Sequence, residues 1–326
     1  MDNKEPWQLF DDVIDQHIAI SLLNAALEKK QIAPAYLFTG PSGVGRSLTA
    51  RRFIEGVITG GAPVIRERNR IEALNHPDLI WIEPTYLHQG NLINQSIAIK
   101  ENLNRRTSPQ LRLEQIKGVK KFLSKKPLET SIGIVVIESV EMMNEAAANA
   151  LLKTLEEPGN GLLILISERP ERLLQTIRSR CQKIPFSRLN KASLEKVLSQ
   201  KEIDQNIESS LLLNQKELIT LSNGSPGALI ANIKTWQEFP KDIWERLETL
   251  PEEPIKSLAL ARDLTEQFDV EQQLWLINWL QQNLWGQHND SRPIKRLEVL
   301  RSQLTSFVQP RLAWEVALLN IAKKRY

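Results

Sequence analysis

Residues 1–185 alternate short apolar runs with amphipathic stretches. The apolar runs are bounded by turn or polar residues and comprise Ala35–Thr39, Leu79–Glu83, Ile134–Ile137 and Leu162–Ser167. Buried parallel strands have this composition, and helices connect them in α/β folds. One predicted helix spans residues 145–157, with Asn144 as its N-cap and Pro158-Gly159 at its end. The pattern therefore predicts an α/β domain with a parallel sheet.

The strand pattern stops after Pro185, and the rest of the chain is predicted to be helical. Short helical patterns surround the turn-rich residues 223–227, and four longer ones follow near residues 256–268, 271–285, 294–307 and 311–323. We therefore predict three domains: an α/β domain at 1–185, a small helical domain at 186–238 and a helical domain at 239–326.

The last predicted helix is apolar on nearly its whole circumference, and six of the eight tryptophans lie at or after Trp236. Core packing explains several of these aromatic residues. A helix that is apolar all round is buried on more than one side, however, and aromatic residues are enriched at interfaces between proteins. Contact with another subunit is therefore the second interpretation of this region.

Composition narrows the class of protein. There is one cysteine, Cys181, which excludes a disulfide framework and a cysteine-rich zinc site. The polar, acidic N-terminus lacks the features of a secretory signal, and no apolar run approaches the length that a bilayer requires. We therefore expect a cytoplasmic protein without membrane contact. The net charge of +3 is compatible with weak contact to phosphates and does not establish it.

Charge is concentrated between Lys100 and Lys126, where nine basic residues face only Glu101 and Glu114. Leu113, Ile116, Val119 and Phe122 recur there at helical spacing, which predicts an amphipathic helix with a basic outer face. A solvated helix surface is one interpretation. A face that contacts DNA or a partner is the other.

The strongest local motif is Gly40-Pro-Ser-Gly-Val-Gly-Arg-Ser47, which follows a predicted strand and opens a predicted helix. Glycines such as Gly43 and Gly45 let backbone N–H groups wrap around phosphates, as in a P-loop. A P-loop has lysine where this chain has Arg46, and the forked guanidinium does not simply replace a compact ammonium. Ser47 keeps the hydroxyl that binds magnesium. We expect P-loop ancestry, and the sequence leaves open whether ATP and magnesium still bind.

A second motif lies at the end of the strand Ile134–Ile137, where Glu138 and Ser139 follow. P-loop ATPases place an Asp here to hold magnesium, often followed by a Glu that polarises the attacking water. A serine hydroxyl has no basicity for this purpose at neutral pH. The expected catalytic base is therefore missing, and together with Arg46 this predicts lost hydrolysis.

Several further motifs occur together and in a specific order. They are His76-Pro-Asp78, Ala146-Ala-Ala-Asn-Ala-Leu-Leu-Lys-Thr-Leu-Glu-Glu-Pro158, Ser167-Glu-Arg-Pro-Glu-Arg-Leu-Leu174, Ser179-Arg180-Cys181, Gly224-Ser-Pro-Gly227 and, more weakly, Gln309-Pro-Arg-Leu312. This set resembles the gamma/tau and delta-prime family of DNA polymerase III clamp-loader subunits. The resemblance covers about the first 230 residues well and the C-terminal third weakly.

The resemblance implies an AAA+ α/β domain, a small helical lid and a C-terminal helical collar within a hetero-oligomeric ring. Expected partners are the gamma/tau and delta subunits and, through the complex, the sliding clamp and primed DNA. In such rings the arginine of the Ser-Arg-Cys motif, here Arg180, reaches a neighbour's ATP. An intramolecular ion pair is the alternative role for Arg180. The family's four-cysteine zinc module is absent from residues 56–76, so we expect no zinc and no required cofactor.

Active relatives carry an ATP-sensing arginine just after Ser-Pro-Gly, where this chain has Ala228. This third departure favours delta-prime-type members, which we expect not to hydrolyse ATP themselves. The alternative is a working gamma/tau-type ATPase that tolerates Arg46 and Glu138.

Overall fold

The computed structural model describes residues 8–88, 91–100, 109–200, 216–251, 253–288, 290–306 and 308–322. The described residues up to Gln200 form one compact unit, and those from Lys216 onward form a second. The predicted three-domain division remains a prediction. No helix within these described ranges combines the length and apolar character needed to cross a bilayer.

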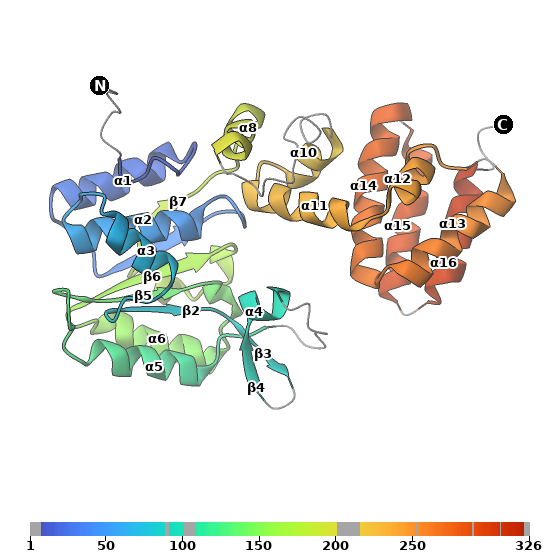
Figure 1. The fold of residues 1–326 in the computed structure, drawn as a ribbon. Coiled ribbons are helices and arrows are strands. Elements are labelled where there is room, and N and C mark those ends of the chain that lie inside the picture. Colours follow the sequence, from blue (N-terminus) through green and yellow to red (C-terminus); the bar gives the residue numbers. More distant parts are fainter. Residues whose placement is uncertain are drawn as a thin grey trace, which may run out of the picture. The chain divides into compact units, whose positions relative to one another are not determined.

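The first unit is built on a parallel five-stranded sheet in the order β2-β5-β6-β1-β7 (Figure 1). Its strands are β1 (Ala35–Thr39), β2 (Leu79–Ile82), β5 (Gly133–Ile137), β6 (Gly161–Ser167) and β7 (Gln182–Pro185). The four strands predicted from apolar runs are confirmed. The fifth, β7, has the polar sequence Gln-Lys-Ile-Pro and was not predicted, because only Ile184 of this edge strand is buried.

Helices cover both faces of this sheet (Figure 1). The first unit contains α1 (His17–Glu28), α2 (Arg46–Thr59), α3 (Ile65–Glu72), α4 (Gln95–Lys100), α5 (Leu113–Leu123), η1 (Val140–Met142), α6 (Glu145–Glu156), η2 (Pro170–Arg172), α7 (Gln175–Arg178) and α8 (Lys191–Gln200). On one face, Tyr36 of β1 packs edge-on against Phe53 of α2. On the other, Leu37 of β1 shares a buried cluster with α5 and α6. Alternating side chains of β1 thus belong to two cores.

A small antiparallel hairpin, β3 (Thr85–His88) and β4 (Asn91–Asn94), stands outside the main sheet. It was not predicted, because its residues carry no long apolar run. α6 matches its prediction closely: the Asn144 side chain accepts a hydrogen bond from the Ala147 N–H at 2.9 Å. The apolar residues expected to recur at helical spacing lie in α5, as predicted, with Ile116 and Val119 buried.

The second unit is entirely helical in its described part. It contains α10 (Lys216–Ser222), α11 (Pro226–Glu238), α12 (Lys241–Glu248), α13 (Pro254–Gln267), α14 (Val270–His288), α15 (Ser291–Thr305) and α16 (Pro310–Ala322). The last four agree with the four predicted helices to within a few residues. Trp244, Trp279 and Trp314 are buried, and an aromatic cluster joins Trp244 to Trp275 and Phe239. Core packing therefore accounts for most of the aromatic enrichment, and Trp285 is the exposed exception.

Asp78 connects β2 to the segment that precedes β5. The carboxylate accepts hydrogen bonds from the N–H groups of Leu128, Glu129 and Thr130 at 2.6–2.8 Å, and from the Thr130 hydroxyl at 3.0 Å. The neighbouring His76 is buried, and its Nδ1 accepts the Asp78 N–H. The His-Pro-Asp motif is therefore a structural turn that joins the loop before β2 to the loop before β5.

Asp78→Asn should lower the free energy of unfolding by about 2–4 kcal/mol, because a charged acceptor of several hydrogen bonds is lost. Burial alone would raise the pKa of Asp78, but the hydrogen bonds from residues 128–130 outweigh it and lower that pKa. A lowered folded-state pKa gives stability that is complete above the unfolded-state pKa, about 4, and is lost as the pH falls below it. Urea denaturation of both proteins between pH 3 and 7 should show a stability difference that shrinks only below about pH 4. A difference that is constant over this range would contradict the assignment.

Candidate functional site: a P-loop and an exposed arginine

The P-loop motif connects β1 to α2, as predicted. Gly40 has φ of +153°, and a Cβ atom there would lie 2.4 Å from the carbonyl oxygen of Phe186. Gly45, the N-cap of α2, has φ of +100°, which side-chain-bearing residues rarely adopt. Both glycines are therefore required by the backbone path, whether or not a phosphate binds.

Gln16 ties this loop to the segment that follows β7. Its side chain is buried, and Nε2 donates to the carbonyl oxygens of Val44 at 3.3 Å and of Ser187 at 2.9 Å. Its Oε1 accepts the Ser187 N–H at 3.1 Å. All three contacts are to backbone atoms, so the loop conformation depends on a side chain that the motif itself does not contain. A lone glutamine carries no sequence signal for this role.

The structure brings Ser47 and Glu138 together across 91 residues of sequence. Ser47 Oγ donates to Glu138 Oε1 at 2.8 Å, and Trp81 Nε1 donates to the same oxygen at 3.1 Å. These are the two positions that hold magnesium in active P-loop ATPases. Trp81 was not predicted. It lies on β2, beside the strand β5 that Glu138 follows, and its ring also lies under the Arg51 guanidinium at 4.7 Å.

Ser139 occupies the position of the expected catalytic base. Its backbone is left-handed, with φ of 50° and ψ of 49°, and it starts the short helix η1. Strain of this kind persists where the surroundings enforce it, and here it turns the chain sharply after Glu138. The next acidic residue, Glu141, uses Oε1 to accept the Glu168 N–H at 3.0 Å. Glu141 is thus bonded to the backbone of another loop, and position 139 itself carries a hydroxyl and no carboxylate.

Arg46 begins α2 and is largely withdrawn from solvent. Burial lowers the pKa of its guanidinium, and the negative charges of Glu141, Glu168 and Glu138 oppose that shift. Its Nη1 atom and the Oε2 atom of Glu141 are buried without a hydrogen-bond partner among the described residues. Three carboxylates of the same chain therefore attract the Arg46 cation, at the position from which an ATPase lysine would face phosphates.

These observations test the fit of a magnesium nucleotide to the site. The glycine backbone and the Ser47–Glu138 pair remain, but the cation is attracted to carboxylates and a serine replaces the catalytic base. The residues present do not fit nucleotide hydrolysis. In the described part of the chain, no group of three or more His, Cys, Asp or Glu side chains could hold a metal ion.

Arg180 lies at the surface, in the turn between α7 and β7. Its Nη2 donates to Glu156 Oε1 at 2.9 Å, and its Nη1 donates to the Thr176 carbonyl oxygen at 3.1 Å. The side chains of Arg180 and Glu156 are 37% and 52% exposed. Exposed ion pairs of this kind contribute roughly 0–1 kcal/mol, so the guanidinium can leave Glu156 at little cost.

Cys181 follows directly and does not act with Arg180. Burial raises the pKa of its thiol to about 12, so the nucleophilic thiolate is not formed at neutral pH. The side chain is half-buried and packs against the buried cluster that includes Leu37 of β1.

Two family models match adjacent parts of the chain. The model described as "DNA polymerase III, delta subunit" matches residues 15–190, and "Cyanobacterial DNA polymerase III delta prime, C-terminal domain" matches residues 192–321. The chain belongs to the DNA polymerase III delta-subunit family. The resemblance noted in the sequence is thereby confirmed, including its delta-prime character.

Curated relatives agree with this family. The DNA polymerase III subunit delta' of Bacillus subtilis is 33% identical over 227 residues, which is 66% of this chain and 61% of that protein. The subunit delta' of Pseudomonas aeruginosa is 30% identical over 205 residues, 61% of this chain and 55% of that protein. The chain thus spans about three fifths of the length of the relatives it matches.

A solved structure shares the fold. A DNA polymerase III gamma subunit-related protein from Thermotoga maritima superposes with a TM-score of 0.51 at 18% identity, over 94% of this chain and 99% of that one. The likeness agrees with the predicted fold class, in which a P-loop α/β domain of the AAA+ type precedes helical domains.

The basic outer face of α5 is present as predicted. Its lysines are exposed, and none makes an ion pair with another described residue; they are Lys117, Lys120 and Lys121, followed by Lys125 and Lys126 just beyond the helix. The basic residues Arg105 and Arg106 lie outside the described residues. A solvated face and a face for DNA or a partner remain the two predictions for this surface.

The Ser47–Glu138 hydrogen bond should be measurable as a coupling energy. Ser47→Ala, Glu138→Ala and the double variant form a cycle in which the pairwise interaction is about 1–2 kcal/mol, because the acceptor is charged. Urea denaturation of the four proteins measures it. Additive effects of the two substitutions would show that the contact contributes nothing to stability.

Proposed function

We propose that this chain is a delta-prime-like subunit of the DNA polymerase III clamp loader, which supplies Arg180 to the nucleotide of a neighbouring subunit and hydrolyses no ATP itself. Its partners are the gamma/tau and delta subunits, and it acts on the sliding clamp and primed DNA through the complex. It works in the cytoplasm, needs no zinc and requires no cofactor of its own.

One observation carries the proposal: the arginine of the Ser-Arg-Cys motif is exposed and weakly held, while Ser139 stands where the chain's own nucleotide site would need a catalytic base. Arg180 is anchored by an exposed carboxylate, Glu156, and by one carbonyl oxygen. A planar guanidinium supplied in trans stabilises charge that develops on a transferred phosphoryl group. Such an arginine needs no nucleotide in the subunit that donates it.

The helical C-terminal unit supports assembly into a ring. On α13 and α16, which pack against each other, Ile255, Leu258, Leu312 and Val316 are exposed although apolar. The opposite side of α16 buries Trp314 and Leu318 in its own unit. Exposed apolar residues on two neighbouring helices are suited to burial against the corresponding helices of other subunits. We assign this surface to the collar that joins the ring.

The second candidate function is a working gamma/tau-type ATPase. The retained Ser47–Glu138 pair favours it, since these groups hold magnesium in active P-loop enzymes. Ser139, Ala228 and the carboxylates around Arg46 oppose it. ATP turnover by the isolated protein separates the two functions.

The purified chain should hydrolyse ATP no faster than buffer alone, with or without primed DNA, because Ser139 stands where the catalytic base is expected. A phosphate-release assay measures this directly. Turnover near 1 s⁻¹, a common enzymatic rate, that disappears in Ser47→Ala would establish the ATPase instead.

Arg180→Ala should leave folding and ring assembly intact and lower the ATPase rate of the assembled complex. A trans-acting arginine contributes on the order of 10³-fold at its site, although other sites in the ring reduce the observed loss. Arg180→Lys should restore little activity, because a point charge lacks the planar fork. Steady-state ATPase and clamp loading are measured on complexes first verified by gel filtration.

The matched control for Arg180 is Arg172→Ala. Arg172 is an exposed arginine of the same segment, and its side chain makes no hydrogen bond or ion pair with another described residue. It should leave the ATPase rate unchanged. Equal rates for wild-type and Arg180→Ala complexes would reduce Arg180 to an intramolecular ion pair with Glu156.

A further inference from the structure

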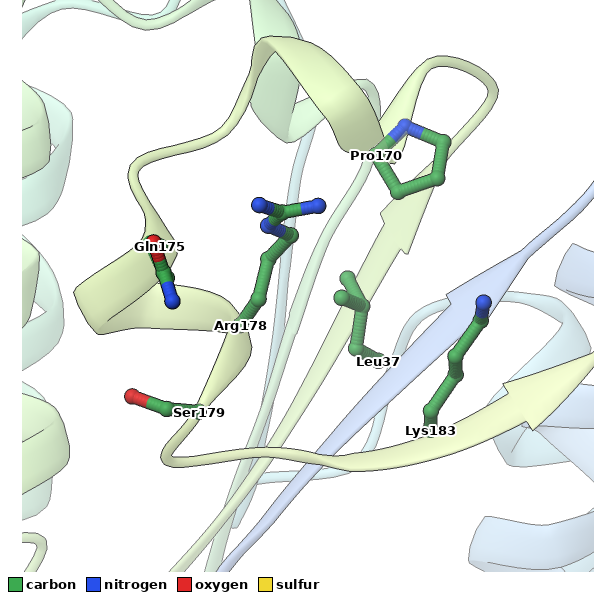
Figure 2. A pocket seen from close by; sticks show the side chains of 6 residues that line it. All are labelled: Leu37, Pro170, Gln175, Arg178, Ser179 and Lys183. Atoms are coloured by element: carbon green, nitrogen blue, oxygen red, sulfur yellow. The ribbon is translucent and has the colours of Figure 1, made fainter.

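A pocket of about 340 Å³ opens beside the Arg180 turn, against β1 and β7. Figure 2 shows its lining, in which side chains from four separate segments converge: Leu37, Pro170, Gln175, Arg178, Ser179 and Lys183. Ligand pockets usually measure roughly 300–1,000 Å³, so this one has room for a few side chains and not for a large cofactor.

The pocket is apolar at its base and positively charged at its rim. Leu37 is 2% exposed and belongs to the buried cluster below the sheet, while Pro170 contributes a second apolar surface. Arg178 and Lys183 are exposed, and neither side chain makes a hydrogen bond or ion pair with another described residue. In Figure 2, Leu37 lies between these two cations. Two uncompensated charges over an apolar base suit an anion attached to an apolar group.

The anion is more suitably a carboxylate than a phosphate. Phosphate sites are usually cradled by free backbone N–H groups, and three of the N–H groups at this turn are already bonded. The N–H groups of Arg178, Ser179 and Arg180 donate to the carbonyl oxygens of Leu174, Gln175 and Ile177. The backbone of β7 pairs with β1. The side chains of Arg178 and Lys183 are therefore the donors at this rim, and a guanidinium can bind a carboxylate through two parallel hydrogen bonds.

We infer that this pocket receives an acidic segment of the neighbouring clamp-loader subunit, with an apolar side chain over Leu37 and a carboxylate between Arg178 and Lys183. The inference rests on the proposed function, because Arg180 of the same turn is the residue that would reach that neighbour. The turn thus has two roles. Arg180 acts on the neighbour's nucleotide, and the pocket binds the neighbouring subunit and fixes its position relative to Arg180.

The test measures the dissociation constant of full-length chain and purified gamma/tau subunit by fluorescence anisotropy, over a range of salt concentrations. Arg178→Ala and Lys183→Met should each weaken binding about tenfold, and the double variant about a hundredfold if the effects are independent. Lys183→Met keeps the length of the side chain and removes its charge, whereas Lys183→Arg should bind like the wild type. The double variant should also lose much of the salt dependence.

Arg172→Ala is the matched control, because it removes an exposed arginine of the same segment that does not line the pocket. It should bind like the wild type. Thermal unfolding checks that each variant is folded, and folding should persist because both substituted side chains are exposed.

The outcomes separate the inference from the proposed function. If the wild-type chain does not bind gamma/tau, the proposed function fails. If the wild type binds and the Arg178 and Lys183 variants bind equally well, the pocket takes no acidic segment and the inference is overturned. If the isolated chain binds ATP and the double variant does not, the pocket takes a nucleotide, which also overturns the inference.

Discussion

The candidate site depends on the hydrogen bonding of β1 on both edges. β6 pairs with it on one side and β7 on the other, with Thr39 opposite Ser167 and also opposite Pro185. In a parallel sheet the carboxyl ends of neighbouring strands meet at one edge, so this register brings the loops that follow them together. The Phe186 N–H then donates to the Thr39 carbonyl, and Gly40 must be a glycine because Phe186 lies against it. The P-loop and the strand that follows Arg180 are therefore built on the same backbone pairing.

Arg46 beside the P-loop and Arg180 in its turn differ in how far each guanidinium is exposed to water. Arg46 is largely withdrawn from solvent, and the negative charges of Glu141, Glu168 and Glu138 of its own chain attract it. Arg180 is exposed, and its contact with Glu156 is weak because water screens it. The same residue type is thus buried near carboxylates at one place and exposed at the surface at another. This contrast agrees with the proposed function, in which Arg180 serves the nucleotide of a neighbouring subunit.

Much of the fold could be predicted from the sequence, because buried strands and amphipathic helices leave strong periodic patterns. The four apolar strands and the helices α13–α16 were found in this way. β7 was missed because an edge strand with one buried residue, Ile184, shows no periodicity, and the hairpin β3–β4 was missed for a similar reason. The P-loop residues, Glu138, Ser139 and Arg180 were identified because motifs mark them. Gln16 and Trp81 were not, because each acts through contacts with residues remote in sequence and belongs to no motif.

The sequence by itself determined the family, the absence of a base at position 139 and the identity of the arginine at 180, since these are properties of residue type and order. Tertiary structure alone decided that Glu138 accepts hydrogen bonds from both Ser47 and Trp81, and that three carboxylates attract Arg46. It also decided that most tryptophans pack inside the helical unit, and that Arg178 and Lys183 stand over Leu37. Burial, ion pairing and pocket shape depend on distances between residues that are remote in sequence, and no local pattern encodes those distances.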